Sequence, residues 1–108
     1  QFGLALVIGA GGILVELLND SCSLLLPTDK QAVERALDSL MVMRMLKGFR
    51  GQKIGDINAL VDAILAIADY AEAHWDNLLE LDINPLLVLP QGQGVVAADA
   101  LVIVANRP

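Results

Sequence analysis

Several side chains on which common functions depend are scarce in this sequence. Aromatic residues make up 4% of its 108 residues, and seven lysines and arginines accompany thirteen aspartates and glutamates, for a net charge of −6. A basic surface and stacking aromatics are typical of nucleic-acid-binding proteins, so we expect no nucleic-acid partner. The single cysteine, Cys22, excludes an internal disulfide and fits a reducing, cytoplasmic location. The single histidine, His74, argues against a histidine-based zinc site.

One long hydrophobic run, Phe2–Leu18, resembles a membrane segment in its hydropathy alone. It contains four glycines and Glu16, and it is shorter than the roughly 20 residues that a spanning helix needs. A signal peptide would need a basic segment before the run, and the sequence has none there. We therefore expect no membrane association and interpret the run as two buried strands. Because the chain opens at Gln1 directly in apolar sequence, we also expect it to be a piece of a longer polypeptide.

The predicted elements follow the order strand, strand, strand, helix, helix, strand, strand. Short apolar runs bounded by glycine, proline or an Asn-Asp pair indicate the strands. This order predicts a single α+β domain over residues 1–108, with a mixed or antiparallel sheet of about five strands and two helices on one face. The expected strands are Leu4–Ile8, Ile13–Leu18, Ser21–Leu26, Leu79–Leu89 and Val95–Val104.

The two helices are predicted from their caps and their apolar stripes. Thr28 and Gln31 have the spacing of a capping box, and Asp56 is a suitable N-cap for the second helix. The first helical segment ends in a loop at Lys47–Gly51, and the second ends near His74. The first apolar stripe comprises Val33, Ala36, Leu37, Leu40 and Met41, and the second comprises Leu60, Val61, Ile64, Ala68 and Ala71.

Alternating polar side chains mark the strand that contains Glu80–Pro85. Because successive side chains of a strand point to opposite faces, Glu80, Asp82 and Asn84 share one face at spacings of about 6.6 to 7 Å. Three oxygen-bearing side chains in a row, two of them anionic, repel one another unless water or a cation lies between them. An ordinary solvated strand face is the alternative interpretation.

The hairpin that follows adds another carboxylate. If Gln91 and Gly92 form its two-residue turn, paired residue numbers sum to 183 and Asn84 lies opposite Asp99. Directly opposed residues share a face, with Cβ atoms roughly 4.5 to 5.5 Å apart. Asp82, Asn84 and Asp99 then form a cluster of hard oxygen ligands, which suits Mg²⁺ and does not suit zinc. A register slip of one residue would separate these side chains.

These residues resemble the metal-binding motif of ATP-grasp enzymes. The closest resemblance is to the NDP-forming acyl-CoA synthetases, which include the succinyl-CoA synthetase β-subunit and the ADP-forming acetyl-CoA synthetases. Asp82–Leu86 is similar to the acidic-x-Asn-Pro motif of that family, and Asp99 matches the Asp on its next strand. The resemblance covers essentially the whole chain and implies the C-terminal subdomain of an ATP-grasp domain. Its other segments, in order, are Phe2-Gly3, Gly9–Glu16, Pro27-Thr28 and Leu46–Gly51.

The resemblance implies part of a synthetase that converts acyl-CoA, NDP and phosphate into acid, CoA and NTP. Asn84 and Asp99 would bind the Mg²⁺ of ATP or ADP, and Asp82 would complete the metal shell or orient a phosphohistidine that lies outside this chain. CoA is a substrate of the whole enzyme. The implied partners are its N-terminal ATP-grasp lobe and its CoA-binding and ligase domains, and a homo-oligomer is left open.

The isolated chain is expected to be inactive, since the resemblance places the adenine-binding hinge and the acyl-CoA site elsewhere. The alternative reading is a non-catalytic, synthetase-like regulatory region of a protein lysine acetyltransferase. A structural domain with an acidic face is a third interpretation.

A glycine-rich segment and one arginine are further candidates for phosphate contact. Gly9, Gly11 and Gly12 would let backbone amides approach phosphate oxygens, although a tight turn between strands explains the same glycines. Glu16 resembles the acidic residue of the family's Val-Glu pair, and the resemblance implies that it would face the same cleft. Arg50 either binds a phosphate or CoA group or is a solvated loop residue.

Four other positions qualify the resemblance. Leu4 stands where the family often has proline, and Leu24 stands where a basic residue is common, which puts the phosphate contacts in doubt. His74 matches no phosphohistidine motif of the family, so we interpret it as structural. Cys22 is interpreted as a small core residue.

Overall fold

Two strands near the N-terminus form an antiparallel pair. The computed structural model describes residues 5–9, 20–48, 51, 53–76, 78–83, 86–97 and 100–104, without the side chains of residues 5, 78, 79 and 82. Strand β1 (Ala5–Gly9) pairs with β2 (Ser21–Leu25). Both strands lie within one residue of the predicted bounds, which is the usual uncertainty of an element's end. The predicted strand Ile13–Leu18 lies outside the described residues.

Helix α2 (Lys30–Asp38) begins one residue later than the predicted capping box requires. Its N-cap is Asp29, whose backbone is extended and whose Oδ1 accepts a hydrogen bond from the Ala32 backbone N–H at 2.8 Å. The predicted box of Thr28 and Gln31 is therefore wrong. A short carboxylate at the N-cap position reaches the third amide of the helix directly, so the donor that Asp29 satisfies is the Ala32 N–H, where the box would have satisfied those of Gln31 and Thr28.

The first predicted helix is divided into two. Helix α2 ends at Asp38, and a second, short helix, α3 (Met43–Leu46), follows after a turn. The predicted stripe fails at this break, because Met41 is 55% exposed whereas Met43, absent from the prediction, is 4% exposed. A helix continued through residue 41 would have buried that methionine.

Helix α4 (Ile57–Ala73) confirms the second helical prediction in detail. Asp56 is its N-cap, with Oδ1 accepting from the Ala59 backbone N–H at 3.2 Å, and His74 is its C-cap. Every residue of the predicted apolar face is buried, namely Leu60, Val61, Ile64, Ala68 and Ala71.

The C-terminal strands form two antiparallel pairs in line. Strand β3 (Leu78–Ile83) pairs with β6 (Ala100–Val104), and β4 (Leu86–Val88) pairs with β5 (Val95–Ala97). The two predicted long strands thus appear as four, with residues 84–85 and 98–99 outside the described part of the chain.

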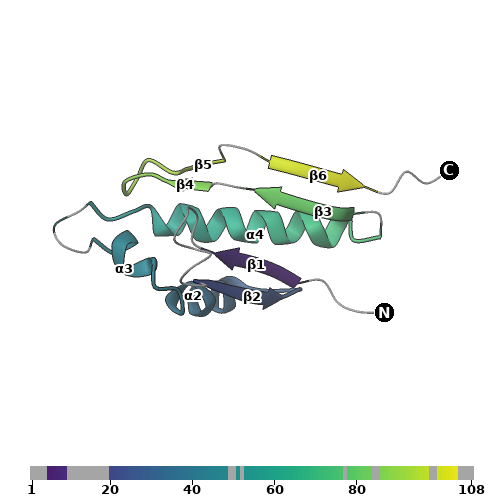
Figure 1. Cartoon of the computed structure of the whole chain (residues 1–108), viewed down its shortest axis with the longest axis horizontal. Helices are drawn as coiled ribbons and strands as arrows, with labels where there is room; N and C mark the ends of the chain where they lie inside the picture. The colour runs from purple at the N-terminus through teal and green to yellow at the C-terminus, as the bar shows by residue number, and fades with distance from the viewer. Residues whose placement is uncertain are drawn as a thin grey trace.

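The described elements confirm the α+β class. Figure 1 shows α4 running along the molecule, drawn between the β1–β2 pair and the four C-terminal strands. Within the described ranges the strands form three two-stranded antiparallel sheets. No helix in these ranges is long and apolar enough to cross a membrane. One core joins β2, α2, α3 and α4, and its buried residues are Leu24, Val33, Leu37, Leu40, Met43, Leu60, Val61 and Ile64.

Candidate functional site

The register of the C-terminal strands is the geometric basis of the candidate site. In β3 and β6, Asp82 lies opposite Leu101 and Ile83 lies opposite Ala100. In β4 and β5, Leu86 lies opposite Ala97. All three pairs have residue numbers that sum to 183, the sum predicted from the sequence. A register irregularity occurs between Leu78 and Glu80, at the far end of β3 from these pairs.

The turn that sets this register has the predicted two central residues. The Gln93 N–H donates to the Pro90 carbonyl oxygen at 2.9 Å, which places Gln91 and Gly92 at the tip. Gly92 has a φ of 87°, a left-handed conformation that glycine adopts without the steric cost of a Cβ atom. The prediction of a Gln91-Gly92 turn is therefore confirmed.

The predicted ligands themselves are only partly described. The backbone of Asp82 belongs to β3, and its side chain is not described. Asn84 and Asp99 lie outside the described residues, between the two pairs of strands in sequence. Among the side chains that the structure does describe, no group of three or more His, Cys, Asp or Glu residues is placed to hold a metal ion.

The predicted phosphate contacts are also mostly outside the described ranges. Gly11, Gly12, Glu16 and Arg50 are not described. Gly9 is the last residue of β1 and lies opposite Ser21. A Cβ atom on Gly9 would lie 3.3 Å from the Ser21 Cβ, so the absence of a side chain serves the close approach of β1 and β2. This role is structural, and phosphate contact by Gly9 stays a prediction.

Asp20 is a buried carboxylate in the Asn-Asp pair that was predicted only to bound a strand. It is 6% exposed, and its two oxygens accept hydrogen bonds from the Met41 and Val42 backbone N–H groups at 2.7 and 2.9 Å. These amides belong to the turn between α2 and α3. Asp20 therefore anchors this turn to the start of β2, and its burial is compensated by two charge-assisted hydrogen bonds.

Asp56 links helix α4 to the hairpin turn, in addition to its predicted role as an N-cap. Its Oδ2 accepts hydrogen bonds from the Gly92 and Gly94 backbone N–H groups at 3.1 and 2.8 Å. The hydrogen bond from Gly94, followed by those from Ala59 and Gly92, lowers the pKa of Asp56 because each donor favours the charged carboxylate. No local sequence pattern indicated this contact, because the partners lie 36 and 38 residues away.

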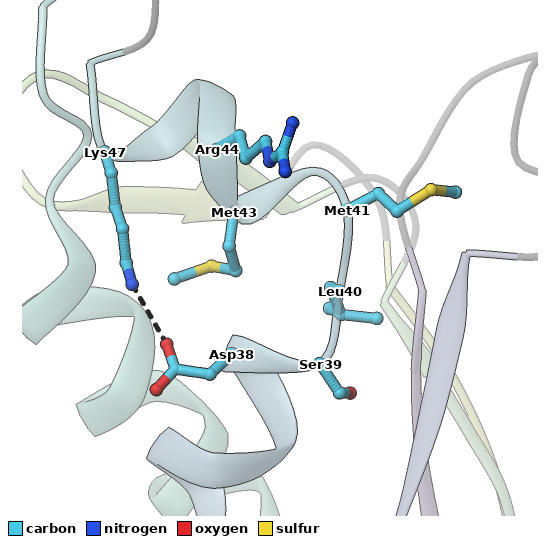
Figure 2. A pocket seen from close by; sticks show the side chains of 7 residues that line it. All are labelled: Asp38, Ser39, Leu40, Met41, Met43, Arg44 and Lys47. Carbon is cyan, nitrogen blue, oxygen red and sulfur yellow. Dashed lines mark hydrogen bonds and ion pairs between the residues drawn. The ribbon is translucent and has the colours of Figure 1, made fainter.

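A shallow hollow of about 270 Å³ lies between α2 and α3. Figure 2 shows the Lys47 ammonium directed at the Asp38 carboxylate, with 3.2 Å between Nζ and Oδ1, and the Met41 side chain directed away from that of Met43. The ion pair is exposed and therefore contributes little to stability. None of the hollow's lining residues was predicted to bind a nucleotide, namely Asp38, Ser39, Leu40, Met41, Met43, Arg44 and Lys47.

Two further side chains agree with the structural roles predicted for them. The His74 ring lies 4.4 Å from the Tyr70 ring, measured between centroids, at the C-terminal end of α4. Cys22 is half-buried in β2 and packs against the core. Burial is the main cause that raises the pKa of the Cys22 thiol, which favours the neutral, less reactive form at neutral pH.

The sequence of the whole chain provides the family assignment. The family model described as the ATP-grasp domain matches residues 1–104. The chain belongs to the ATP-grasp family. Its relatives include the acetate–CoA ligase (ADP-forming) II subunit beta of Pyrococcus furiosus, which is 34% identical over 95% of this chain and 44% of the relative. Acetate–CoA ligase (ADP-forming) II of Archaeoglobus fulgidus is 35% identical over 99% of this chain and 15% of the relative.

Two solved structures share the fold of the chain. A crystal structure of PH1788 from Pyrococcus horikoshii matches 99% of this chain and 45% of its own, with 31% identity and a TM-score of 0.90. The dinucleotide-forming acetyl-coenzyme A synthetase 1 of Ca. Korarchaeum cryptofilum, in complex with coenzyme A and Mg-AMPPCP, matches 96% of this chain and 47% of its own, with 31% identity and a TM-score of 0.85. The chain thus spans less than half the length of these relatives.

Proposed function

We propose that this chain is the Mg²⁺- and nucleotide-binding part of an NDP-forming acyl-CoA synthetase. In this proposal Asn84 and Asp99 bind the Mg²⁺ of the nucleotide, and Asp82 completes the metal shell or orients a phosphohistidine of another part of the enzyme. The main support is the register of the described strands. Paired residue numbers sum to 183 both at the end of the β3–β6 pair and in the β4–β5 pair, and the proposed ligands lie between these two pairs in the sequence. The family membership and the ADP-forming ligases among its relatives support the same activity.

The chemistry of the proposed ligands suits magnesium. Two carboxylates and one amide supply hard oxygen ligands, and Mg²⁺ is typically held by one or two carboxylates together with substrate phosphates and water. The ion, when bound, would neutralise the charge that develops on the transferring phosphoryl group. The acidic composition of the chain, with a net charge of −6, favours a role for such a cation in binding a polyphosphate.

Other parts of the proposed site come from the glycine-rich segment and from the rest of the enzyme. Gly9, Gly11 and Gly12 are proposed to face the phosphates through their backbone amides, with Glu16 and Arg50 in the same cleft. The proposed partners are the N-terminal ATP-grasp lobe and the CoA-binding and ligase domains. Because these parts would complete the active site, we expect the chain alone to catalyse no turnover of ATP or acyl-CoA.

The test is the affinity of the full-length protein for ADP in the presence of Mg²⁺, measured by calorimetry. Asn84→Ala and Asp99→Asn are expected to weaken Mg²⁺–ADP binding by about 10- to 100-fold, at least as much as the loss of an outer-shell partner of a metal site. Asp62→Asn is the matched control, because it removes the same charge from the exposed side of α4 and is expected to leave the affinity unchanged.

Two outcomes would contradict the proposal. Equal affinities for the wild type, Asn84→Ala and Asp99→Asn would remove these residues from the metal site. The full-length protein could also bind Mg²⁺–ADP tightly and yet fail to convert acyl-CoA, NDP and phosphate into acid, CoA and NTP. That result would favour the regulatory alternative over the synthetase.

A further inference from the structure

The N-terminus of helix α4 and the turn of the β4–β5 hairpin lie at the same end of the molecule (Figure 1). Asp56 joins them through its two carboxylate oxygens, which have different partners. Oδ1 caps the helix by accepting from the Ala59 backbone N–H, and Oδ2 accepts from the backbone N–H groups of Gly92 and Gly94. The two oxygens thus separate the capping role from the hairpin contact.

The backbone next to Asp56 adds further contacts with the same turn. The Asp56 N–H donates to the Leu89 carbonyl oxygen at 2.8 Å, and the Gln91 N–H donates to the Ile54 carbonyl oxygen at 2.8 Å. Gly55 forms an antiparallel bridge with Pro90. The segment before α4 is therefore held against the turn by main-chain hydrogen bonds as well as by the carboxylate.

Three positions of this junction favour glycine, two for their backbone conformation and one for close packing. Gly92 and Gly94 have φ values of 87° and 86°, and in this conformation their two N–H groups converge on a single oxygen of Asp56. At Gly55, a Cβ atom would lie 3.0 Å from the Leu46 Cδ2 and 3.1 Å from the Val88 Cγ1. The junction is thus closely packed at Gly55, and hydrogen bonds from the main chain and from Asp56 hold the turn against the start of α4.

We propose that Asp56 is a positioning residue for the Mg²⁺–nucleotide site. By holding the turn of the hairpin against the N-terminus of α4, Asp56 fixes the direction of β4 and β5. These are the strands that follow Asn84 and precede Asp99 in the sequence, so a change in their direction would displace the proposed ligands. This inference rests on the proposed function of those two residues.

Asp56→Asn separates the hairpin contact from the cap. Asn caps helices about as well as Asp, because its amide oxygen accepts the same hydrogen bond. Its amide nitrogen, in place of Oδ2, cannot accept from Gly92 or Gly94. Asp29→Asn is the matched control, because Asp29 caps α2 in the same way. Asp56→Ser is a second variant, which keeps a capping oxygen and lacks the one that reaches the hairpin.

The measurement is the affinity of the full-length protein for ADP with and without Mg²⁺. We expect Asp56→Asn and Asp56→Ser to weaken Mg²⁺–ADP binding by about 10-fold, the lower end of the range for outer-shell partners of metal sites. Metal-free ADP should bind as it does to the wild type, and Asp29→Asn should change neither affinity. A general loss of structure would lower both affinities together, so the difference between them reports on the position of the metal ligands.

The outcomes distinguish this inference from the proposed function. Mg²⁺–ADP binding that is equal in Asp56→Asn, Asp29→Asn and the wild type would overturn the positioning role, and so would an equal loss of binding with and without Mg²⁺. If Asn84→Ala and Asp99→Asn also leave the Mg²⁺–ADP affinity unchanged, the proposed metal site is wrong and the positioning role falls with it.

Discussion

Two aspartates anchor different parts of the chain through backbone amides. Asp20 accepts from two amides of the turn between α2 and α3, and Asp56 accepts from two amides of the hairpin turn. Among the described residues, no cationic side chain takes part in either anchor. In both cases a carboxylate accepts hydrogen bonds from backbone N–H groups of a turn, outside the regular hydrogen bonding of helices and strands. These hydrogen bonds hold the turn in one conformation.

At the residue scale, the loss of the Asp20 carboxylate should destabilise the fold measurably. Asp20→Ala removes the acceptor of two part-buried backbone amides, and we expect it to lower the free energy of unfolding by about 1 to 3 kcal/mol. Asp38→Ala is the control, since it removes an acid whose ion pair with Lys47 is exposed, for an expected change of about 0 to 1 kcal/mol. Urea unfolding followed by circular dichroism measures both, and equal losses would show that the Asp20 contacts are unimportant.

At the element scale, stability depends on how α4 and the β4–β5 hairpin are joined. The described contacts between them come from main-chain hydrogen bonds, from the packing of Val88 and Val95 on the core, and from the Asp56 carboxylate. Of these contacts, the carboxylate is the one whose strength changes with pH.

The link between helix and hairpin should weaken in acid. Hydrogen bonds hold the pKa of Asp56 below its ordinary value, so in acid the unfolded state takes up this proton before the folded state does. The stabilisation that the ionised Asp56 carboxylate contributes is therefore complete above about pH 4, near the ordinary pKa of aspartate. It is lost as the pH falls through the lower pKa that Asp56 has in the folded state. The melting temperature of the wild type, measured between pH 2 and pH 7, should fall in this range more steeply than that of Asp56→Asn.

The same comparison contains its own check. The difference in melting temperature between wild type and Asp56→Asn should be largest near neutral pH and should shrink in acid. Asp29→Asn serves again as the matched substitution at the other helix cap. A difference between wild type and Asp56→Asn that stays constant at every pH would contradict the assigned role of the charged carboxylate.

At the scale of the whole molecule, one core connects the N-terminal strands with all the described helices. Leu37 of α2 is 2% exposed and belongs to the same buried cluster as Leu24 of β2 and Ile64 of α4. Damage to this cluster should therefore affect β2, α2, α3 and α4 together.

Truncation of the core should destabilise the fold far more than the same truncation on the surface. Leu37→Ala is expected to lower the free energy of unfolding by about 2 to 5 kcal/mol, through lost burial and the cavity that remains. Leu25→Ala makes the same change at a side chain that is 79% exposed, and we expect an effect within about 0.5 kcal/mol. Chemical unfolding of the two variants provides the comparison, and similar losses would mean that the cluster is not the core.

The sequence by itself determined the features that depend on local periodicity and turn chemistry. The buried face of α4 follows from the 3.6-residue repeat of its apolar side chains, and the cap at Asp56 follows from a short acceptor just before that repeat. The hairpin register follows from the Gln91-Gly92 turn, because a turn of known length fixes every pair behind it. The same reasoning selected Asn84 and Asp99 as ligands, and their role stays a prediction.

Only the tertiary structure decided where α2 ends and what else Asp56 contacts. In the turn between α2 and α3, the Met41 and Val42 amides donate to Asp20, which lies 21 and 22 residues before them in the sequence. After this turn Met43 is buried in the core, while Met41 is exposed. The second role of Asp56 depends on glycines 36 and 38 residues later. Contacts across such distances leave no periodic trace in the sequence, since they arise only when packing brings the segments together.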